Sequence, residues 1–359
     1  MNITIYGAGN VGTQFAVHCA SKGHRTTIFT SKPERISKTL TIIDENDKVT
    51  LSSSIDNVTN DAFTAFNDAD LIFVIIPSYC MDQAALAILP YVHENMHICI
   101  VPGTGAAEAA FDKCIKKGAI LCGLQRVLSV ARLVEYGKTV RAIGYRSTLH
   151  VCTIPISKAA EFAKTIEGLF DIKTVALPNY LNITLTPSNP ILHTTRLKVL
   201  FQDYKPGKVY DKVDLFYQQW NDESSDLLLK ADDEVQQICH KLSMFDLSYV
   251  KSLKEHYESD TVDKMTKKIS SIKGFQGLTS PTVKVEGGYI PDFSSRYFTA
   301  DFPYGLAILI QIANFTQVDC PTLINTYNWY RSLCPNIQQF NYSDYNIYTL
   351  EDFIHFYQR

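Results

Sequence analysis

Residues 295–306 place a guanidinium and a carboxylate, Arg296 and Asp301, just ahead of Pro303. A proline suits the first turn of a helix, and the residue before a proline avoids helical angles. We therefore predict a helix that begins at Pro303, with Phe302 as its cap. Asp301 then lies outside the helix and its carboxylate is not needed as a cap. Arg296 offers the planar fork that binds a carboxylate through two hydrogen bonds.

A second proline-led segment surrounds His193. Pro190 suits the first helical position, with Asn189 as the cap, which puts His193 about one turn into the helix. A nearby carboxylate would fix the tautomer of this imidazole, and Asp301 is the candidate. A lone histidine on a helix is more often a structural residue. The three residue types together, including Arg296, favour an acid–base site.

The turn from Gly7 to Gly12 follows an apolar run and precedes a helical segment. In a dinucleotide-binding turn of this spacing, Gly7 permits the tight turn and Gly9 lets the backbone approach a pyrophosphate. Gly12 lets the helix pack closely on the strand. The diphosphate would bind at the start of the helix, around Asn10 and Val11. The alternative is an incidental glycine-rich turn.

The tip of the second expected strand indicates which dinucleotide binds. An NAD site has an acidic residue there, which accepts hydrogen bonds from the ribose hydroxyls. In this chain Thr30 takes that place and is followed by Ser31, Lys32 and Arg35. Hydroxyl and cationic groups favour a 2′-phosphate, so we predict that NADPH is preferred over NADH. The alternative is that the cations are solvated loop charges. Pro77, at the end of a later strand, is expected beside the nicotinamide.

Alternating apolar and amphipathic stretches in the first 150 residues predict parallel α/β units. Two β-rich runs, Thr139–Ile143 and Leu149–Ile154, follow one another without a helix and predict an antiparallel addition to the sheet edge. Helical periodicity dominates after Pro178, so the second domain is expected to be all-helical, with Ser280–Ser295 as an exposed loop. We divide the chain into a Rossmann-type doubly wound domain at 1–180 and a helical substrate-binding and catalytic domain at 181–359.

Composition narrows the class of protein. A net charge of -3 over 359 residues predicts no nucleic-acid partner and no attraction to an anionic membrane. The nine cysteines are scattered, none lies in a C-x-x-C pair, and the spacing of a metal site is absent. The first residues are already expected to form a strand. We therefore expect a cytoplasmic protein with reduced thiols, without a presequence or a membrane span.

At these motifs the chain resembles the opine dehydrogenase family of the octopine/nopaline type. That family joins an N-terminal Rossmann domain to a helical C-terminal domain, in an arrangement similar to 6-phosphogluconate dehydrogenase. The resemblance rests on the glycine turn, the Asn189-Pro190-x-x-His193 motif and the run from Arg296 to Leu306. Further similarity lies in Ala131–Gly137, in Asp232–Val235 and in Gly274–Leu278.

The resemblance implies reductive condensation of an α-keto acid, commonly pyruvate, with the amino group of an amino acid. The imine that forms is reduced by NADPH. His193 would be the general acid/base, Asp301 would orient it, and Arg296 would hold a substrate carboxylate. The expected partners are thus a small keto acid and an amino acid, and the aromatic-rich C-terminal segment leaves a homodimer open.

Two alternatives remain open at this point. A ketopantoate-reductase-like or 2-hydroxyacid dehydrogenase would reduce a keto acid without any amine. A regulator that senses NADP(H) without catalysis would keep the same fold.

Overall fold

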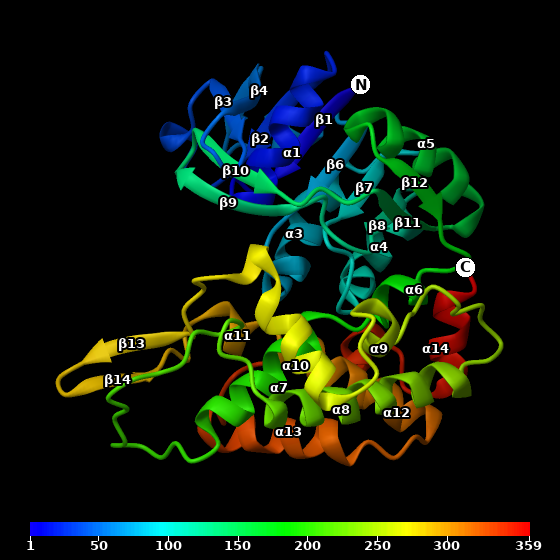
Figure 1. The fold of residues 1–359 in the computed structure, drawn as a ribbon. Coiled ribbons are helices and arrows are strands. Elements are labelled where there is room, and N and C mark those ends of the chain that lie inside the picture. Colours follow the sequence, from blue (N-terminus) through cyan, green and yellow to red (C-terminus); the bar gives the residue numbers. More distant parts are fainter. The chain divides into compact units, whose positions relative to one another are not determined.

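The computed structural model describes all 359 residues, which fold into two compact units (Figure 1). The first unit contains residues 1–184 and 357–359, and the second contains residues 185–356. Residues 181–184 and the last three residues thus belong to the first unit, beyond the division expected at residue 180. There the hydroxyl groups of Thr184 and Tyr357 both donate to the buried carboxyl group of Glu108.

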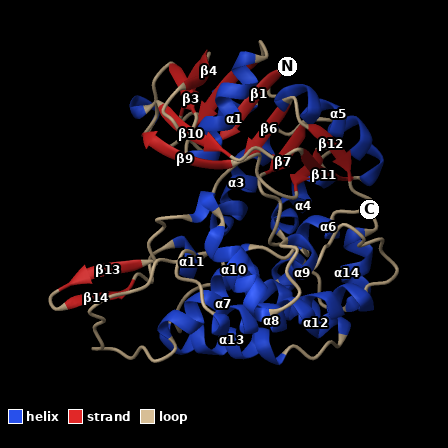
Figure 2. Ribbon diagram, viewed as in Figure 1, coloured by secondary structure: helices blue, strands red, loops and turns tan.

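The first unit is built on an eight-stranded sheet of the order β12-β11-β8-β7-β6-β1-β2-β5 (Figure 2). The six strands from β8 to β5 are parallel, β11 runs antiparallel to β8, and β12 runs parallel to β11. The direction of the connections reverses between β1 and β6, the position where open sheets of this kind bind ligands. The predicted Rossmann-type sheet is confirmed. Its strands are β1 (Asn2–Tyr6), β2 (Arg25–Phe29), β5 (Asn57–Thr59), β6 (Leu71–Val74), β7 (His97–Ile100), β8 (Ile120–Leu124), β11 (Thr148–Ile154) and β12 (Lys173–Ala176).

Apolar side chains of the strands and the helices form the core of this unit. Ile3 and Ile5 of β1, Phe15 of α1, Phe73 of β6 and Phe162 of α5 are all buried in one cluster. Burial of such side chains is the main source of stability for a domain of this size. The helices are α1 (Asn10–Ser21), α2 (Ala62–Phe66), α3 (Met81–Ile88), α4 (Asp112–Lys116), α5 (Ala159–Phe170) and α6 (Leu181–Thr184), with short 3₁₀ turns η1 (Pro33–Arg35), η2 (Ser78–Cys80), η3 (Leu89–Tyr91), η4 (Ala107–Phe111) and η5 (Ile156–Lys158).

A second sheet of four strands, in the order β4-β3-β10-β9, corrects part of the prediction. Its strands are β3 (Thr39–Ile43), β4 (Val49–Ser54), β9 (Val130–Glu135) and β10 (Thr139–Ile143). The expectation that 139–143 joins the main sheet is wrong, because β10 pairs with β3 and β9 instead. The other β-rich run, β11, does make the predicted antiparallel addition to the main sheet, beside β8.

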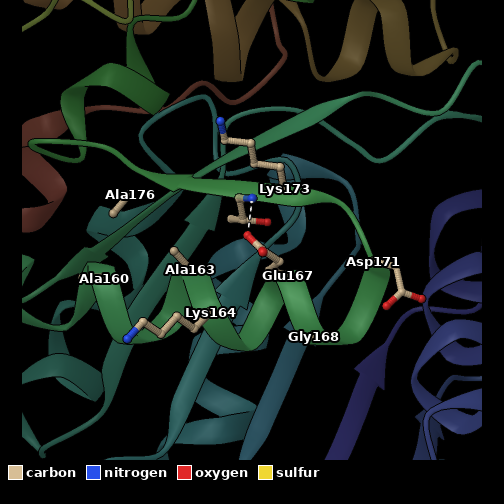
Figure 3. A pocket seen from close by; sticks show the side chains of 9 residues that line it. Ala160, Ala163, Lys164, Glu167, Gly168, Asp171, Lys173 and Ala176 are labelled. Atoms are coloured by element: carbon tan, nitrogen blue, oxygen red, sulfur yellow. Dashed lines mark hydrogen bonds between the residues drawn. The ribbon is translucent and has the colours of Figure 1, made fainter.

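The edge strand β12 of the main sheet is protected by a side chain. The Glu167 carboxylate accepts a hydrogen bond of 2.9 Å from the backbone N–H of Thr174, as Figure 3 shows. This contact lies in a groove formed by α5 and β12, with lysines on both elements. An unpaired edge N–H is a template for pairing with another chain, and the carboxylate covers this one. The groove is lined by Ala160, Ala163, Lys164, Glu167, Gly168, Asp171, Lys173, Thr174 and Ala176.

The second unit is mainly helical. The longest helix, α8, is capped by Asn221, whose side chain accepts from the N–H of Ser224 at 3.1 Å. In α8 the buried Glu234 accepts hydrogen bonds from the first N–H groups of α13, and Asp232 accepts one from the first residue of α9. None of the helices combines the length and the apolar character that a membrane crossing needs. The helices are α7 (Asn189–Phe201), α8 (Asp222–Lys241), α9 (Leu253–His256), α10 (Val262–Ser271), α11 (Arg296–Thr299), α12 (Ala307–Thr316), α13 (Pro321–Leu333) and α14 (Leu350–Tyr357), with short turns η6 (Lys273–Phe275), the π-helical η7 (Phe302–Leu306) and η8 (Tyr342–Tyr345).

A β-hairpin interrupts the helices of this unit and corrects the expected exposed loop. Strands β13 (Thr282–Val285) and β14 (Gly288–Pro291) pair antiparallel around a glycine turn (Figure 2). A short bridge between Tyr210 and Tyr289 adds further pairing at one side. The unit is therefore not entirely helical, although the hairpin is its only regular sheet. The hairpin leads directly into α11, which carries Arg296.

Candidate active site

The glycine turn lies between β1 and α1, at the carboxyl end of a central strand. Gly7 has a φ of +117°, a left-handed value that favours glycine, and a Cβ there would lie 2.3 Å from the carbonyl oxygen of Ile75. A Cβ on Gly12 would lie 1.9 Å from the carbonyl oxygen of Gly7. The helix and the strand thus approach as closely as the motif predicts. Gly9 differs, because open space surrounds the position that its Cβ would take.

The start of α1 fits a dinucleotide diphosphate. Gly9 is the N-cap residue and no side chain caps the helix, so its first N–H groups have no side-chain acceptor. An uncapped helix start beside open space at Gly9 is a suitable anion site. Asn10 and Val11 open the helix. The side-chain oxygen of Asn10 accepts a hydrogen bond of 2.7 Å from the backbone N–H of Leu133 and so ties β9 to the turn. Cofactor binding by Asn10 and Val11 stays a prediction.

The tip of β2 carries the residues expected to distinguish NADP from NAD. Thr30 is only 9% exposed and its hydroxyl accepts from the backbone N–H of Lys32 at 3.4 Å, whereas the side chains of Ser31, Lys32 and Arg35 are exposed. The guanidinium carbon of Arg35 lies 4.6 Å from the centre of the Tyr136 ring. This cation–π contact, with the turn between β9 and β10, was not anticipated from the sequence. It holds a cation at the tip of β2.

Pro77 follows β6, the strand that pairs with β1. The close approach of Gly7 to the Ile75 carbonyl brings this turn beside the glycine turn, at the same edge of the sheet. Pro77 is exposed. Its position is compatible with a place beside the nicotinamide, which stays a prediction.

His193 lies in the first turns of α7, as predicted. Pro190 is in the first turn, but the N-cap residue is Ser188 and Asn189 is already the first helical residue. The helix therefore begins one residue earlier than predicted. The His193 side chain is 3% exposed, so its hydrogen-bond partners are protein groups rather than bulk water.

Asp301 hydrogen-bonds to His193, as predicted from the sequence. Its Oδ2 lies 2.7 Å from Nδ1 of the imidazole, across a separation of 108 residues in the chain. A carboxylate only accepts, so Nδ1 carries the proton and Nε2 of the neutral ring is an acceptor. Asp301, rather than Phe302, occupies the N-cap position of η7, and its side chain makes no capping hydrogen bond. The carboxylate therefore hydrogen-bonds to the imidazole and does not cap the helix.

Arg296 begins α11 and is exposed. The ring centre of Tyr297 lies 5.8 Å from the guanidinium carbon of Arg296 and 4.5 Å from the ring centre of His193. Arg296 and His193 thus both neighbour Tyr297 in the second unit, and Asp301 contacts His193. The exposed fork of Arg296 is suited to a carboxylate ligand.

Sequence reasoning missed Tyr217. Its hydroxyl lies 2.6 Å from Nε2 of His193, and its ring stacks on Phe275 with centres 4.2 Å apart. Burial is the main cause that raises the pKa of Tyr217 well above its usual value. The only available signal was the aromatic run Phe216-Tyr217, which also suits a buried core segment. The imidazole is therefore hydrogen-bonded at both nitrogens.

Two protein-family models match the two parts of the chain. Residues 176–334 match the family described as NAD/NADP octopine/nopaline dehydrogenase, alpha-helical domain. Residues 3–142 match Ketopantoate reductase PanE/ApbA. The first match contains all three predicted catalytic residues, and the second contains the glycine turn.

Relatives match over most of their length. An octopine dehydrogenase of Pecten maximus is 25% identical over 326 residues, which cover 84% of this chain and 82% of that protein. A tauropine dehydrogenase of Arabella iricolor is 24% identical over 361 residues, with 92% and 91% covered.

Solved structures share the fold. Octopine dehydrogenase with NADH and L-arginine superimposes with a TM-score of 0.84 at 21% identity, covering 98% of this chain and 97% of that one. A ketopantoate reductase of Ralstonia eutropha JMP134 gives 0.61 at 14% identity, with 93% and 98% covered. The helical-domain model and the relatives that match both units agree on one assignment. The helical part of this chain thus matches the octopine/nopaline dehydrogenase family, the relatives of both units are opine-type dehydrogenases, and the chain is identified as an oxidoreductase that acts on the CH–NH group of its donors.

Proposed function

We propose that this protein catalyses the NADPH-dependent reductive condensation of an α-keto acid such as pyruvate with the amino group of an amino acid. The observation that carries the proposal is the buried hydrogen bond between His193 and Asp301, at a helix start of the second unit. The relatives named octopine and tauropine dehydrogenase support the same substrate class.

The residues of the second unit suit distinct roles. His193 would give a proton to the carbonyl oxygen during condensation and to the imine nitrogen before reduction, as a general acid. Asp301 would orient the ring and stabilise its protonated form. Arg296 would hold a substrate carboxylate and so fix the distance between the reacting carbon and the imidazole. The bound cofactor supplies the hydride.

We propose NADPH as the preferred cofactor because no acidic residue stands at the tip of β2. Ser31, Lys32 and Arg35 are exposed there, and the guanidinium of Arg35 lies over the ring of Tyr136. A 2′-phosphate would gain charge-assisted hydrogen bonds from these groups.

A coupled screen tests the reaction. The loss of NADPH is followed with pyruvate alone, and with pyruvate together with each amino acid in turn. An opine dehydrogenase consumes NADPH only when an amine is present, and mass spectrometry should detect the secondary amine that joins the two substrates. Turnover of a keto acid alone, without such a product, would favour a keto-acid reductase, the activity class of the family that matches residues 3–142. Binding of NADPH without any turnover would favour a regulator.

The role of His193 is tested by His193→Ala, with His240→Ala as a matched control on an exposed face of α8. Loss of the general acid should lower kcat by about 10² or more and leave NADPH affinity unchanged. The control should keep full activity. Arg296→Lys should mainly raise KM for the substrate whose carboxylate it holds, since lysine lacks the two-pronged fork. Full activity of His193→Ala would remove the basis of the proposed function.

Cofactor preference is tested by Arg35→Ala and Lys32→Ala, with Lys38→Ala as the control. Each of the first two changes should weaken NADPH binding by about tenfold and leave NADH binding nearly unchanged. Lys38 is exposed on the same segment but lies beyond the tip of β2. Equal losses for both cofactors would contradict the predicted preference.

A further inference from the structure

Asp301 is hydrogen-bonded to Nδ1 of His193, and the hydroxyl of Tyr217 is hydrogen-bonded to the other ring nitrogen, Nε2. Asp301 accepts from Nδ1–H at 2.7 Å, so in the neutral ring Nε2 accepts a hydrogen bond from the phenol hydroxyl at 2.6 Å. The phenol remains protonated, because burial keeps its pKa well above the usual value. Both rings are buried, with exposures of 3% for His193 and 4% for Tyr217.

Arg196 holds the segment that presents this phenol. Its side chain is completely buried, and its Nε and Nη2 donate to the carbonyl oxygens of Phe216 at 3.0 Å and Gln219 at 2.7 Å. These two carbonyls flank Tyr217 in the chain. Nη1 donates to Ser224 at the start of α8, at 3.0 Å. Since a buried guanidinium is costly to leave unpaired, the segment has little freedom to move.

The groups around the imidazole can be named from each neighbouring element. Asp301 approaches from the residue before η7, and Arg296 and Tyr297 approach from α11. Tyr257, beyond α9, contributes to the electrostatic surroundings of Tyr217. Asp301 is thus the acidic group in direct contact with the ring, and Tyr217 is the hydroxyl donor in direct contact with it.

We propose that Tyr217 is a positioning residue that holds His193 from the side opposite Asp301, and that Arg196 keeps it in place. The phenol and the carboxylate together fix the plane and the tautomer of the ring before substrate binds. This inference rests on the proposed role of His193 and adds a residue that acts through it.

Tyr217→Phe tests the proposal without any activity measurement. Phenylalanine keeps the stacked ring on Phe275 and removes only the donor. In ¹⁵N NMR of the substrate-free protein, the Nε2 resonance of His193 should move towards that of a ring nitrogen without a hydrogen bond. Its absence in His193→Ala assigns the signal. Tyr210→Phe, which removes a hydroxyl bonded to Asp203 in the same connecting segment, should leave the resonance unchanged. An unchanged resonance in Tyr217→Phe would overturn the proposal.

Activity gives a second, separate readout. Tyr217→Phe should lower kcat/KM by about threefold to tenfold, the effect of one lost hydrogen bond. A loss as large as that of His193→Ala would overturn a positioning role. Full activity of His193→Ala would instead contradict the proposed function. The NMR result would still decide whether the hydrogen bond from Tyr217 positions the imidazole.

Arg196→Lys provides a second variant of the same proposal. Lysine keeps the charge but cannot donate to both flanking carbonyls at once. The Nε2 resonance should shift in the same direction as in Tyr217→Phe, by a smaller amount. A shift in Tyr217→Phe without any in Arg196→Lys would overturn the part of the proposal that assigns the support to Arg196.

Discussion

Glu108→Gln should remove a pH dependence of folding stability that the wild-type chain has between about pH 5 and about pH 8. The carboxyl group of Glu108, in η4, is completely buried in the first unit. One oxygen accepts from the hydroxyls of Thr184 and Tyr357, and the other has no hydrogen-bond partner. Burial raises the pKa of Glu108 to about 7, and the two hydroxyl donors offset this only in part.

The magnitude follows from the two pKa values of Glu108. A rise from the usual 4.5 to about 7 corresponds to about 3 kcal/mol, at about 1.4 kcal/mol for each pH unit. The folded protein keeps a proton that the unfolded chain releases. Stability therefore falls as the pH rises from the unfolded pKa through the folded one, and the whole penalty is present above it. Between about pH 5 and about pH 8 the loss is about 2–3 kcal/mol.

Urea denaturation followed by circular dichroism measures this loss. The free energy of unfolding of the wild type should fall by about 2–3 kcal/mol more than that of Glu108→Gln over this pH range. Glutamine keeps the accepting oxygen but places an amide where the unpartnered oxygen lies, a cost that does not change with pH. The dependence on pH, rather than the absolute stability, is thus the measured quantity.

Glu94→Gln is the matched control, since Glu94 is exposed in the same unit. It should follow the wild type at every pH. Tyr357→Phe removes a donor to the carboxylate and should lower stability more at about pH 8 than at about pH 5. Parallel curves for the wild type and Glu108→Gln would show that the buried carboxyl group binds its proton as in the unfolded chain, and would refute the reasoning.

Three further changes have outcomes that follow from single contacts. Gly12→Ala would place a Cβ 1.9 Å from the Gly7 carbonyl oxygen, and should both abolish NADPH binding in a fluorescence titration and destabilise the fold by at least about 1–3 kcal/mol. Glu234→Gln weakens the cap of α13 and should lower the free energy of unfolding by about 1 kcal/mol, measured by urea denaturation. Glu167→Ala uncovers the edge N–H of Thr174, and light scattering should detect more self-association than in the wild type, with little change in activity.

Local patterns predicted most of the fold. The strand at 25–29 and the helices near 191–201 and 222–242 follow from periodicity within a single segment, and the structure has them within a few residues. The second sheet could not be found in this way. Leu40 and Ile42 alternate with threonines as a half-buried strand would, but β3 pairs with β10, about a hundred residues later. That pairing depends on the tertiary fold, which a local sequence pattern does not encode.

The residues of the candidate site also fall into two groups: those that a local sequence pattern identifies, and one whose position depends on tertiary contacts. His193 was located because a proline-led helix start is a local signal, and Asp301 because a proline follows it closely. Tyr217 lies in a connection without periodicity. Its contact with His193 exists because Arg196 donates hydrogen bonds to the carbonyl oxygens of Phe216 and Gln219 and so holds the loop between α7 and α8 against α7. The spacing of the residues in the sequence does not indicate these hydrogen bonds.

The two motifs that carry the acid–base pair meet because residue 305 is a glycine. A Cβ on Gly305 would lie 2.9 Å from Cγ of Pro190, so a larger residue would force η7 away from α7. The same turn is π-helical, with the N–H of Leu306 donating to the carbonyl oxygen of Asp301 at 2.8 Å, and it follows directly on the carboxylate. Any displacement of η7 would carry Asp301 with it and lengthen its 2.7 Å hydrogen bond to His193. Gly305 and Pro190 have no acid–base chemistry of their own, yet their contact sets the distance on which the chemistry of the pair depends.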